Sequence, residues 1–382
     1  MPGLGDTTAM LARLRRQSPS MSSGTGRLER IDEFGPNPGQ LAMLSYSPEG
    51  LAPRSPLVVV LHGCTQTATT YAEGAGWLAL ADRFGFAVLA PEQTTANNPN
   101  RCFNWFSPGD VRRGEGEAGS IASMVAYITE AKNLDPTRVF VTGLSAGGAM
   151  AAAMLAAYPD VFAAGAVIAG LPYGVARNVQ DAMRVMSRPD GRPAAALAEL
   201  AANRTRAAPA PRLAIWHGDA DFTVNVGNAH DLAQQWSALH GLPSAPHRVE
   251  QQSFGARSIW RSASGEALVE MNLVRGLGHG APLSTGGVDD VGRVAPSMLE
   301  AGVSSSLEIA RFWKIDTRRS ETVASRRPED ADGTPDAKPS PMGHEPAQAA
   351  SLGHNVMSAL SQVPVGVQET IAKALRAAGL MS

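Results

Sequence analysis

Residues 138–148 have the sequence RVFVTGLSAGG, and an Ala- and Met-rich stretch follows them. The first five residues favour a strand and 146–157 favours a helix, so a Gly-x-Ser-x-Gly motif falls at a strand-to-helix turn. Glycines two residues either side of Ser145 leave room for such a turn. The following helix directs unpaired N–H groups to the same point, which favours a developing negative charge. We interpret Ser145 as a nucleophile; the structural alternative is a small-residue turn that only packs a helix on a sheet.

Short apolar runs alternate with helical patterns from about Leu28 to Lys314. This alternation is typical of βαβ units, so we expect the α/β class, one core, and a mainly parallel sheet flanked by helices. The predicted strands are 56–61, 86–89, 138–142, 164–169, 213–216 and 267–274. The predicted helices are 76–84, 120–133, 146–157 and 226–239, with a last one near 296–313.

The remaining segments differ in composition from this core. We expect an N-terminal arm at 1–27, the main domain at 28–315 with a small helical cap at about 172–211, a disordered linker at 316–350, and an amphipathic helical segment at 351–382. The linker is rich in Arg, Glu, Asp, Pro and Ser. The cap segment is rich in Ala, Arg and Pro, which does not fit a strand.

Composition excludes several classes of protein. The 382 residues are 44% apolar and carry 33 basic and 35 acidic side chains, which gives a net charge of −2. There is no excess positive charge for nucleic acid or an anionic membrane surface, so we expect neither as a partner. The most apolar region, 147–171, is interrupted by Tyr158, Pro159 and Asp160, which argues against a membrane span. Residues 1–26 lack the apolar core of a signal peptide, so we expect a cytoplasmic or non-classically exported protein.

Three histidines lie in loops at the ends of predicted strands: His62, His217 and His279. Glycines flank His279 and let its loop return over the sheet edge toward the serine, so we choose it as the general base. Asp219 and Asp221 both follow the strand 213–216. We choose Asp221 as the acid, because the loop needs length to reach the imidazole and Asp219 is close enough to the turn to bond its own backbone. The chain order Ser, Asp, His is the one expected of an α/β-hydrolase fold.

The strand 56–61 ends in a tight loop, His62-Gly63-Cys64. In α/β-hydrolases this loop donates one backbone N–H to the oxyanion hole and the residue after the nucleophile donates the other. Cys64 and Ala146 are therefore the expected donors, and losing one such donor typically costs ~3 kcal/mol of transition-state stabilisation. We expect His62 to be structural, holding the loop by hydrogen bonds.

Other motifs carry no further chemistry. Residues 114–119 satisfy Gly-x-Gly-x-x-Gly, but they follow no predicted strand and place two carboxylates where a pyrophosphate would lie, so we discount dinucleotide binding. No metal-ligand or Walker pattern occurs, and we expect no cofactor and no metal. Cys64 and Cys102 form either a disulfide or two small buried thiols, and the sequence leaves both open.

Five motifs occur in the order of one known family: LHGCTQ at 61–66, PEQ at 91–93, CFNWF at 102–106, GLSAGGAM at 143–150 and HGDAD at 217–221. On these motifs, residues 28–313 closely resemble the polyhydroxybutyrate depolymerase family of esterases. The resemblance implies Ser145, Asp221 and His279 as the catalytic triad and Cys64 as an oxyanion donor. It also implies an ester substrate, a 3-hydroxyalkanoate polymer or oligomer.

The same resemblance leaves the substrate open. Many family members are secreted and carry substrate-binding modules, neither of which is recognisable here, so soluble oligomers or small esters are the expected substrates. Trp105 and Phe106 either line the acyl site or form an aromatic pair in the core. An acetylxylan or feruloyl esterase is the enzyme alternative, and a non-catalytic binding protein that keeps the fold is the alternative from another class.

Overall fold

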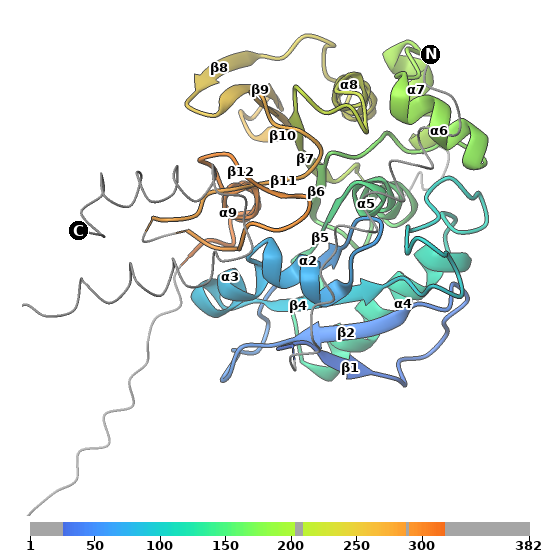
Figure 1. Cartoon of the computed structure of the whole chain (residues 1–382), viewed down its shortest axis with the longest axis vertical. Coiled ribbons are helices and arrows are strands. Elements are labelled where there is room, and N and C mark those ends of the chain that lie inside the picture. The colour runs from blue at the N-terminus through green and yellow to red at the C-terminus, as the bar shows by residue number, and fades with distance from the viewer. Residues whose placement is uncertain (1–25, 203–208, 288–289, 318–382) are drawn as a thin grey trace, which may run out of the picture. The chain divides into compact units, whose positions relative to one another are not determined.

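The computed structural model describes residues 26–202, 209–287 and 290–317 (Figure 1). Apart from a few edge residues, the expected N-terminal arm, linker and C-terminal helical segment lie outside them. All described residues belong to one unit of the chain, Met1–Glu321. Among the described helices, none combines the length and apolar character needed to cross a bilayer.

Ten described strands form one mixed sheet. Their order is β1 (Glu29–Ile31), β2 (Ala42–Tyr46), β4 (Ala87–Glu92), β3 (Leu57–Leu61), β5 (Val139–Leu144), β6 (Ala164–Ile168), β7 (Arg212–Gly218), β10 (Ala267–Val274), β9 (Gly255–Arg261) and β8 (Arg248–Gln252). The six strands from β4 to β10 pair in parallel. Antiparallel pairs extend the sheet at both edges. The prediction of a mainly parallel sheet is confirmed.

The six predicted strands are the six parallel strands. Central strands such as β3, LVVVL, are buried throughout, and continuous apolar runs of this kind are easily recognised. The sequence analysis missed β1, β2, β8 and β9, which lie toward the two sheet edges and are partly exposed or polar, and it missed the short pair β11 (Ala281–Leu283) and β12 (Met298–Glu300). Edge strands are recognised mainly through pairing, which a single segment does not reveal.

Helices cover both faces of the sheet. Helices α4 (Gly116–Ala131), α5 (Ala146–Ala157) and α8 (Gly227–Leu239) contribute to one apolar core. Helices α2 (Ala68–Gly74), α3 (Trp77–Phe84) and α9 (Ser305–Phe312) contribute to the other. Strand β3 supplies both, since Val59 lies in the first core and Val58 and Val60 in the second. This alternation is the period-two pattern of a strand between two helical layers.

The segment between β6 and β7 contains helices α6 (Val179–Ser187) and α7 (Ala194–Ala202). Val185 and Leu197 from these helices join a third apolar cluster, which also contains Trp105 and Ala146. Helix α7 is tied to α8, because Gln235 Nε2 donates to the carbonyl of Leu197 over 2.8 Å. These helices therefore pack beside the residue that follows Ser145.

The prediction of a helix near 296–313 is wrong for the first half of that range. Residues Met298–Glu300 form β12, which pairs in parallel with β11, and the helix begins only at Ser305. Ser304 is the N-cap, because its side chain accepts a hydrogen bond from Leu307 N–H. Gly302, at φ 64°, turns the chain between strand and helix.

The parallel topology brings four strand ends to one edge of the sheet. Strand β3 ends before His62, β5 before Ser145, β7 before Asp219, and β10 before the loop of His279. In sheets of this kind the carboxyl ends of the strands form the binding edge. Ser145, Asp221, His279 and Cys64 lie in loops or turns at this edge, and Ala146 is the first residue of the helix α5 that begins there.

Candidate active site

Ser145 lies on the turn between β5 and α5. Its backbone is at φ 57° and ψ −116°, a conformation that a non-glycine residue rarely adopts and that functional sites often contain. Its N–H donates to the carbonyl of Ile168 at 2.9 Å. A Cβ atom on Gly143 would lie 2.3 Å from the carbonyl oxygen of Gly147, and one on Gly147 would lie 2.2 Å from that of Leu61. Both glycines are therefore required for the turn.

His279 is brought to the serine from 134 residues further along the chain. Its Nε2 lies 2.9 Å from Ser145 Oγ, and its Nδ1 lies 2.7 Å from Asp221 Oδ2. Because the Asp221 carboxylate can only accept at Nδ1, the proton of the neutral ring is on Nδ1 and Nε2 is free to accept from the serine. The structure thus forms a continuous row of carboxylate, imidazole and hydroxyl.

The side chain of Asp221 is fully buried. Its second oxygen, Oδ1, accepts hydrogen bonds from the N–H groups of Thr223, at 2.8 Å, and Val224, at 2.9 Å. Burial acts to raise the pKa of Asp221, but hydrogen bonds from His217, His279 and Val224 outweigh it and hold the pKa well below its usual range. The carboxylate is therefore ionised and fixed where His279 needs it.

Asp219, the aspartate that we did not choose as the acid, has a different role from the one that we inferred from the sequence. Asp219 does not bond its own turn; its Oδ1 accepts from the N–H of Gly276 at 2.6 Å, which lies 57 residues further along the chain. Gly276 belongs to the loop that carries His279. Asp219 therefore ties the acid loop to the base loop, a long-range contact that local turn chemistry does not predict.

His217 contacts the triad, although the sequence analysis gave it no role. It is buried, and its Nε2 lies 2.9 Å from the carbonyl oxygen of Val224 and 3.4 Å from Asp221 Oδ2. A carbonyl only accepts, so Nε2 carries the proton and also faces the carboxylate. The available signal was the i, i+4 spacing of His217 and Asp221 in HGDAD.

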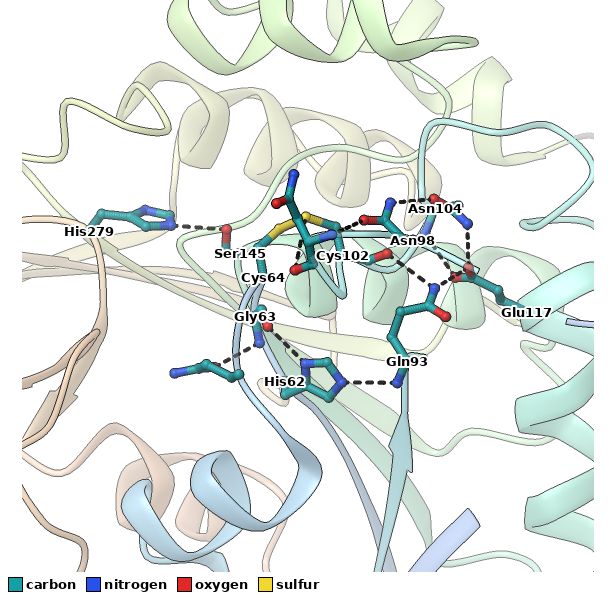
Figure 2. Close-up of a disulfide and its surroundings, with 12 residues drawn as sticks. His62, Gly63, Cys64, Gln93, Asn98, Cys102, Asn104, Glu117, Ser145 and His279 are labelled. Atoms are coloured by element: carbon teal, nitrogen blue, oxygen red, sulfur yellow. Dashed lines mark hydrogen bonds between the residues drawn. A yellow bond between two sulfur atoms is a disulfide. The ribbon is translucent and has the colours of Figure 1, made fainter. Parts of the chain in front are cut away.

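The two expected oxyanion donors lie on either side of the serine turn. The N–H of Ala146 is the first of α5 and that of Cys64 lies in the loop after β3. Among the described residues neither N–H has a hydrogen-bond partner. Figure 2 shows Cys64 next to Ser145. Two unpaired donors beside a nucleophile suit a tetrahedral oxyanion.

The structure resolves the open question of the cysteines. Cys64 and Cys102 form a disulfide between segments 38 residues apart (Figure 2). A further contact joins the same segments, since Thr65 N–H donates to Asn100 O at 2.7 Å. The loop that carries one expected oxyanion donor is thus fixed to the segment that carries Trp105.

Trp105 and Phe106 take part in packing. Trp105 is 8% exposed and belongs to the third apolar cluster together with Ala146 and Ala149. Phe106 meets it nearly edge-on, with ring centroids 5.7 Å apart and an 81° interplanar angle. Trp105 is therefore a member of this cluster and Phe106 packs against it half-buried, and the cluster includes the residue after the nucleophile.

A buried carboxylate lies in the motif that we discounted for dinucleotide binding. Glu117, in the first turn of α4, is inaccessible to solvent, and burial raises its pKa to about 8. It accepts hydrogen bonds from the Asn104 N–H and Asn104 Nδ2, both at 2.8 Å, and from the side chains of Gln93 and Asn97. Glu117 therefore organises the segment next to the disulfide (Figure 2), a role that the sequence analysis missed.

Within the described residues, no group of three or more His, Cys, Asp or Glu side chains is arranged to hold a metal ion.

A family model described as Esterase PHB depolymerase matches residues 41–250. The chain belongs to this esterase family. It is 41% identical over 297 residues to poly(3-hydroxyalkanoate) depolymerase C of Paucimonas lemoignei, covering 77% of this chain and 72% of that protein.

Acetylxylan esterases are also similar to the chain. The acetylxylan esterase of Coprinopsis cinerea is 33% identical over 278 residues, covering 70% of this chain and 72% of that protein. The solved acetyl xylan esterase from Aspergillus awamori superposes with a TM-score of 0.63 at 25% identity, covering 76% of this chain and all of that one. The chain is therefore a serine ester hydrolase with the α/β-hydrolase fold, as the sequence predicted, rather than a non-catalytic binding protein.

Proposed function

We propose that this esterase cleaves short-chain 3-hydroxyalkanoate esters, with Ser145 as nucleophile, His279 as general base and Asp221 as the acid that orients it. The backbone N–H groups of Cys64 and Ala146 form the oxyanion hole. The single observation that carries these roles is the unbroken row from Asp221 through His279 to Ser145, with contacts of 2.7 and 2.9 Å.

The geometry supports acyl transfer in two steps. Nε2 of His279 takes the Ser145 proton as Oγ attacks the ester carbonyl, and the two N–H groups stabilise the tetrahedral oxyanion. The imidazolium then gives this proton to the departing alcohol, which leaves an acyl-enzyme. A water molecule attacks the acyl-enzyme with the same proton transfers and releases the carboxylic acid. The ionised Asp221 stabilises the imidazolium in both steps.

Two observations support a hydroxyalkanoate substrate. The identity to the Paucimonas lemoignei depolymerase, 41%, exceeds that to the Coprinopsis cinerea acetylxylan esterase, 33%. The apolar cluster of Trp105, Ala146 and Ala149 includes the residue after the nucleophile, and apolar surroundings suit a short aliphatic acyl chain. Soluble oligomers are the proposed form of the substrate.

Acetylxylan is the second candidate substrate, favoured by the superposition over the whole of the Aspergillus awamori enzyme. The discriminating experiment compares kcat/KM of the purified protein for 3-hydroxybutyrate trimer and for acetylated xylan oligosaccharide. We expect the trimer to be the better substrate. Faster acetyl release from xylan would replace the first candidate by the second.

The role of Ser145 is tested separately. A fluorophosphonate should label the wild-type protein covalently, and Ser145→Ala should lose the label together with activity on both substrates. Labelling or hydrolysis that survives in Ser145→Ala would overturn the proposed mechanism.

A further inference from the structure

The peptide unit between Gly63 and Cys64 carries the expected oxyanion donor. A trans peptide unit is planar, and its C=O and N–H point in opposite directions. The direction of the Cys64 N–H is therefore fixed by whatever holds the Gly63 carbonyl. The inference below rests on the proposed role of this N–H in catalysis.

The Gly63 carbonyl is held by the side chain of His62. Its oxygen lies 2.8 Å from His62 Nδ1. A second, longer hydrogen bond comes from the N–H of Gln66, at 3.3 Å. Figure 2 shows His62 on one side of the Gly63–Cys64 segment in this view and Ser145 on the other.

The protonation state of His62 follows from its other nitrogen. The backbone N–H of Gln93 donates to His62 Nε2 at 3.1 Å. Nε2 must therefore be the unprotonated, accepting nitrogen, and the single proton of the neutral ring is on Nδ1, where it is donated to the Gly63 carbonyl. Both ring nitrogens are matched to backbone groups.

The surroundings keep this ring neutral. His62 is completely buried, its ring lies 5.0 Å from that of Phe103, and burial lowers its pKa to about 4, with Arg101 acting in the same direction. A protonated ring would set an Nε2–H against the Gln93 N–H. At neutral pH only the neutral ring with its proton on Nδ1 satisfies both contacts.

The partner of His62 is itself fixed. The side chain of Gln93 donates to the carbonyl of Cys102 at 3.1 Å and to the carboxylate of Glu117. Cys102 is joined to Cys64 by the disulfide. The two residues on either side of the peptide bond that follows Gly63 are thus anchored to the same segment, one by hydrogen bonds through His62 and Gln93, the other covalently.

We propose that His62 is a positioning residue of the oxyanion hole: its Nδ1–H holds the Gly63 carbonyl away from Ser145 and so directs the Cys64 N–H toward the ester carbonyl. Without this donor the peptide unit keeps, within the described part of the chain, only the longer contact with Gln66 and can rotate, which would withdraw the Cys64 N–H from the reacting oxygen. This role is separate from general acid-base chemistry, because His62 contacts no triad residue.

Two variants divide the functions of the imidazole between them. In His62→Asn the amide Nδ2 can take the place of imidazole Nδ1 and still donate to Gly63, whereas nothing accepts from Gln93. In His62→Gln the amide Oε1 can take the place of Nε2 and accept from Gln93, whereas nothing donates to Gly63. Both lose the ring packing on Phe103, so each is the control for the other.

We expect kcat to fall much further in His62→Gln than in His62→Asn. His62→Gln should lose about 100-fold in kcat with little change in KM, the lower range for a lost oxyanion donor. His62→Asn should stay within about tenfold of wild type. Binding of a trifluoromethyl ketone, whose adduct with Ser145 places an oxyanion in the hole, should weaken in the glutamine variant only. Equal kcat in the two variants, or losses that follow their melting temperatures, would overturn the role of His62.

A measurement on the wild-type protein covers the case in which a variant does not fold. Nitrogen-15 NMR of the assigned His62 ring at pH 7 should show the proton on Nδ1, and a proton on Nε2 would overturn the proposal. Ser145→Ala separates this inference from the proposed function. Activity that survives in Ser145→Ala removes both, whereas activity lost there but equal in the two His62 variants removes only the role of His62.

Discussion

The two sides of the site are built differently. On the triad side, side chains from the loops after β5, β7 and β10 form one hydrogen-bonded row. Asp219 ties the loop after β7 to the loop after β10, and His217 contacts Asp221. On the oxyanion side, the expected reacting groups are backbone N–H groups, and one of them is aimed by a buried assembly of His62, Gln93, Glu117 and a disulfide. Chemistry carried by a side chain is visible in a motif; chemistry carried by a peptide group depends on what orients it.

A substitution on the triad side should cause the largest loss of kcat. In Asp221→Asn the proton of His279 can be held in the wrong tautomer, so we expect kcat to fall by about 10⁴, which corresponds to about 5.5 kcal/mol of barrier. Steady-state kinetics on a soluble ester measures it. Asp219→Asn is the matched control, because the amide oxygen can still accept from Gly276, and kcat should change less than about threefold. A larger loss in Asp219→Asn than in Asp221→Asn would reverse our choice of acid.

Removing the disulfide should have the second largest effect, a decrease in the free energy of unfolding. Joining positions 38 residues apart restricts the unfolded chain by about 4 kcal/mol in the chain-entropy model. The double variant Cys64→Ser/Cys102→Ser keeps both backbone N–H groups, and its free energy of unfolding in urea should be lower by about that amount. Wild-type protein denatured under reducing conditions should behave like the double variant. An unchanged midpoint would show that the segment is held by its hydrogen bonds alone.

Glu117 should have a smaller but pH-dependent effect. In Glu117→Gln an NH₂ group faces a donor from which the carboxyl group of Glu117 accepted a hydrogen bond, so we expect a loss of about 2 kcal/mol in the free energy of unfolding at pH 5. The folded-state pKa of Glu117, about 8, is above its ordinary value of 4.5. The wild-type residue therefore stabilises most fully below pH 4.5 and loses this contribution as the pH rises through about 8.

The advantage of wild type over Glu117→Gln should consequently shrink between about pH 4.5 and pH 8. Urea denaturation of both proteins across this range measures the difference directly. A difference that grows with pH would mean that the cage of hydrogen bonds lowers the pKa of Glu117 instead.

His217 should have the smallest effect. His217→Asn removes the donor that faces Asp221 Oδ2, and the loss of one hydrogen bond to a charged group predicts about a tenfold fall in kcat. In His217→Gln the amide can reach the position of Nε2 and should restore most of kcat. No difference between the two variants would reduce His217 to a packing residue.

The sequence analysis named the triad and the expected oxyanion donors, but it missed the residues that hold the oxyanion side in place. Ser145, Asp221 and His279 were identified from a turn motif, chain order and glycine-flanked loops, and the structure brings all three together. Glu117 was dismissed with a misleading glycine motif, and the pairing of Cys64 with Cys102 was left open. Both become meaningful only through residues distant along the chain, such as Gln93 and Asn104.

The sequence alone determined the class of fold, the six central strands, the nucleophile turn and the order of the triad, because each rests on periodicity or on residue types within a short segment. Only the tertiary structure decided the edge strands, the true partner of Asp219, the disulfide and the protonation of His62. Those features depend on which distant backbone groups meet. A buried polar atom takes its partner from wherever the fold supplies one, and no local pattern records that choice.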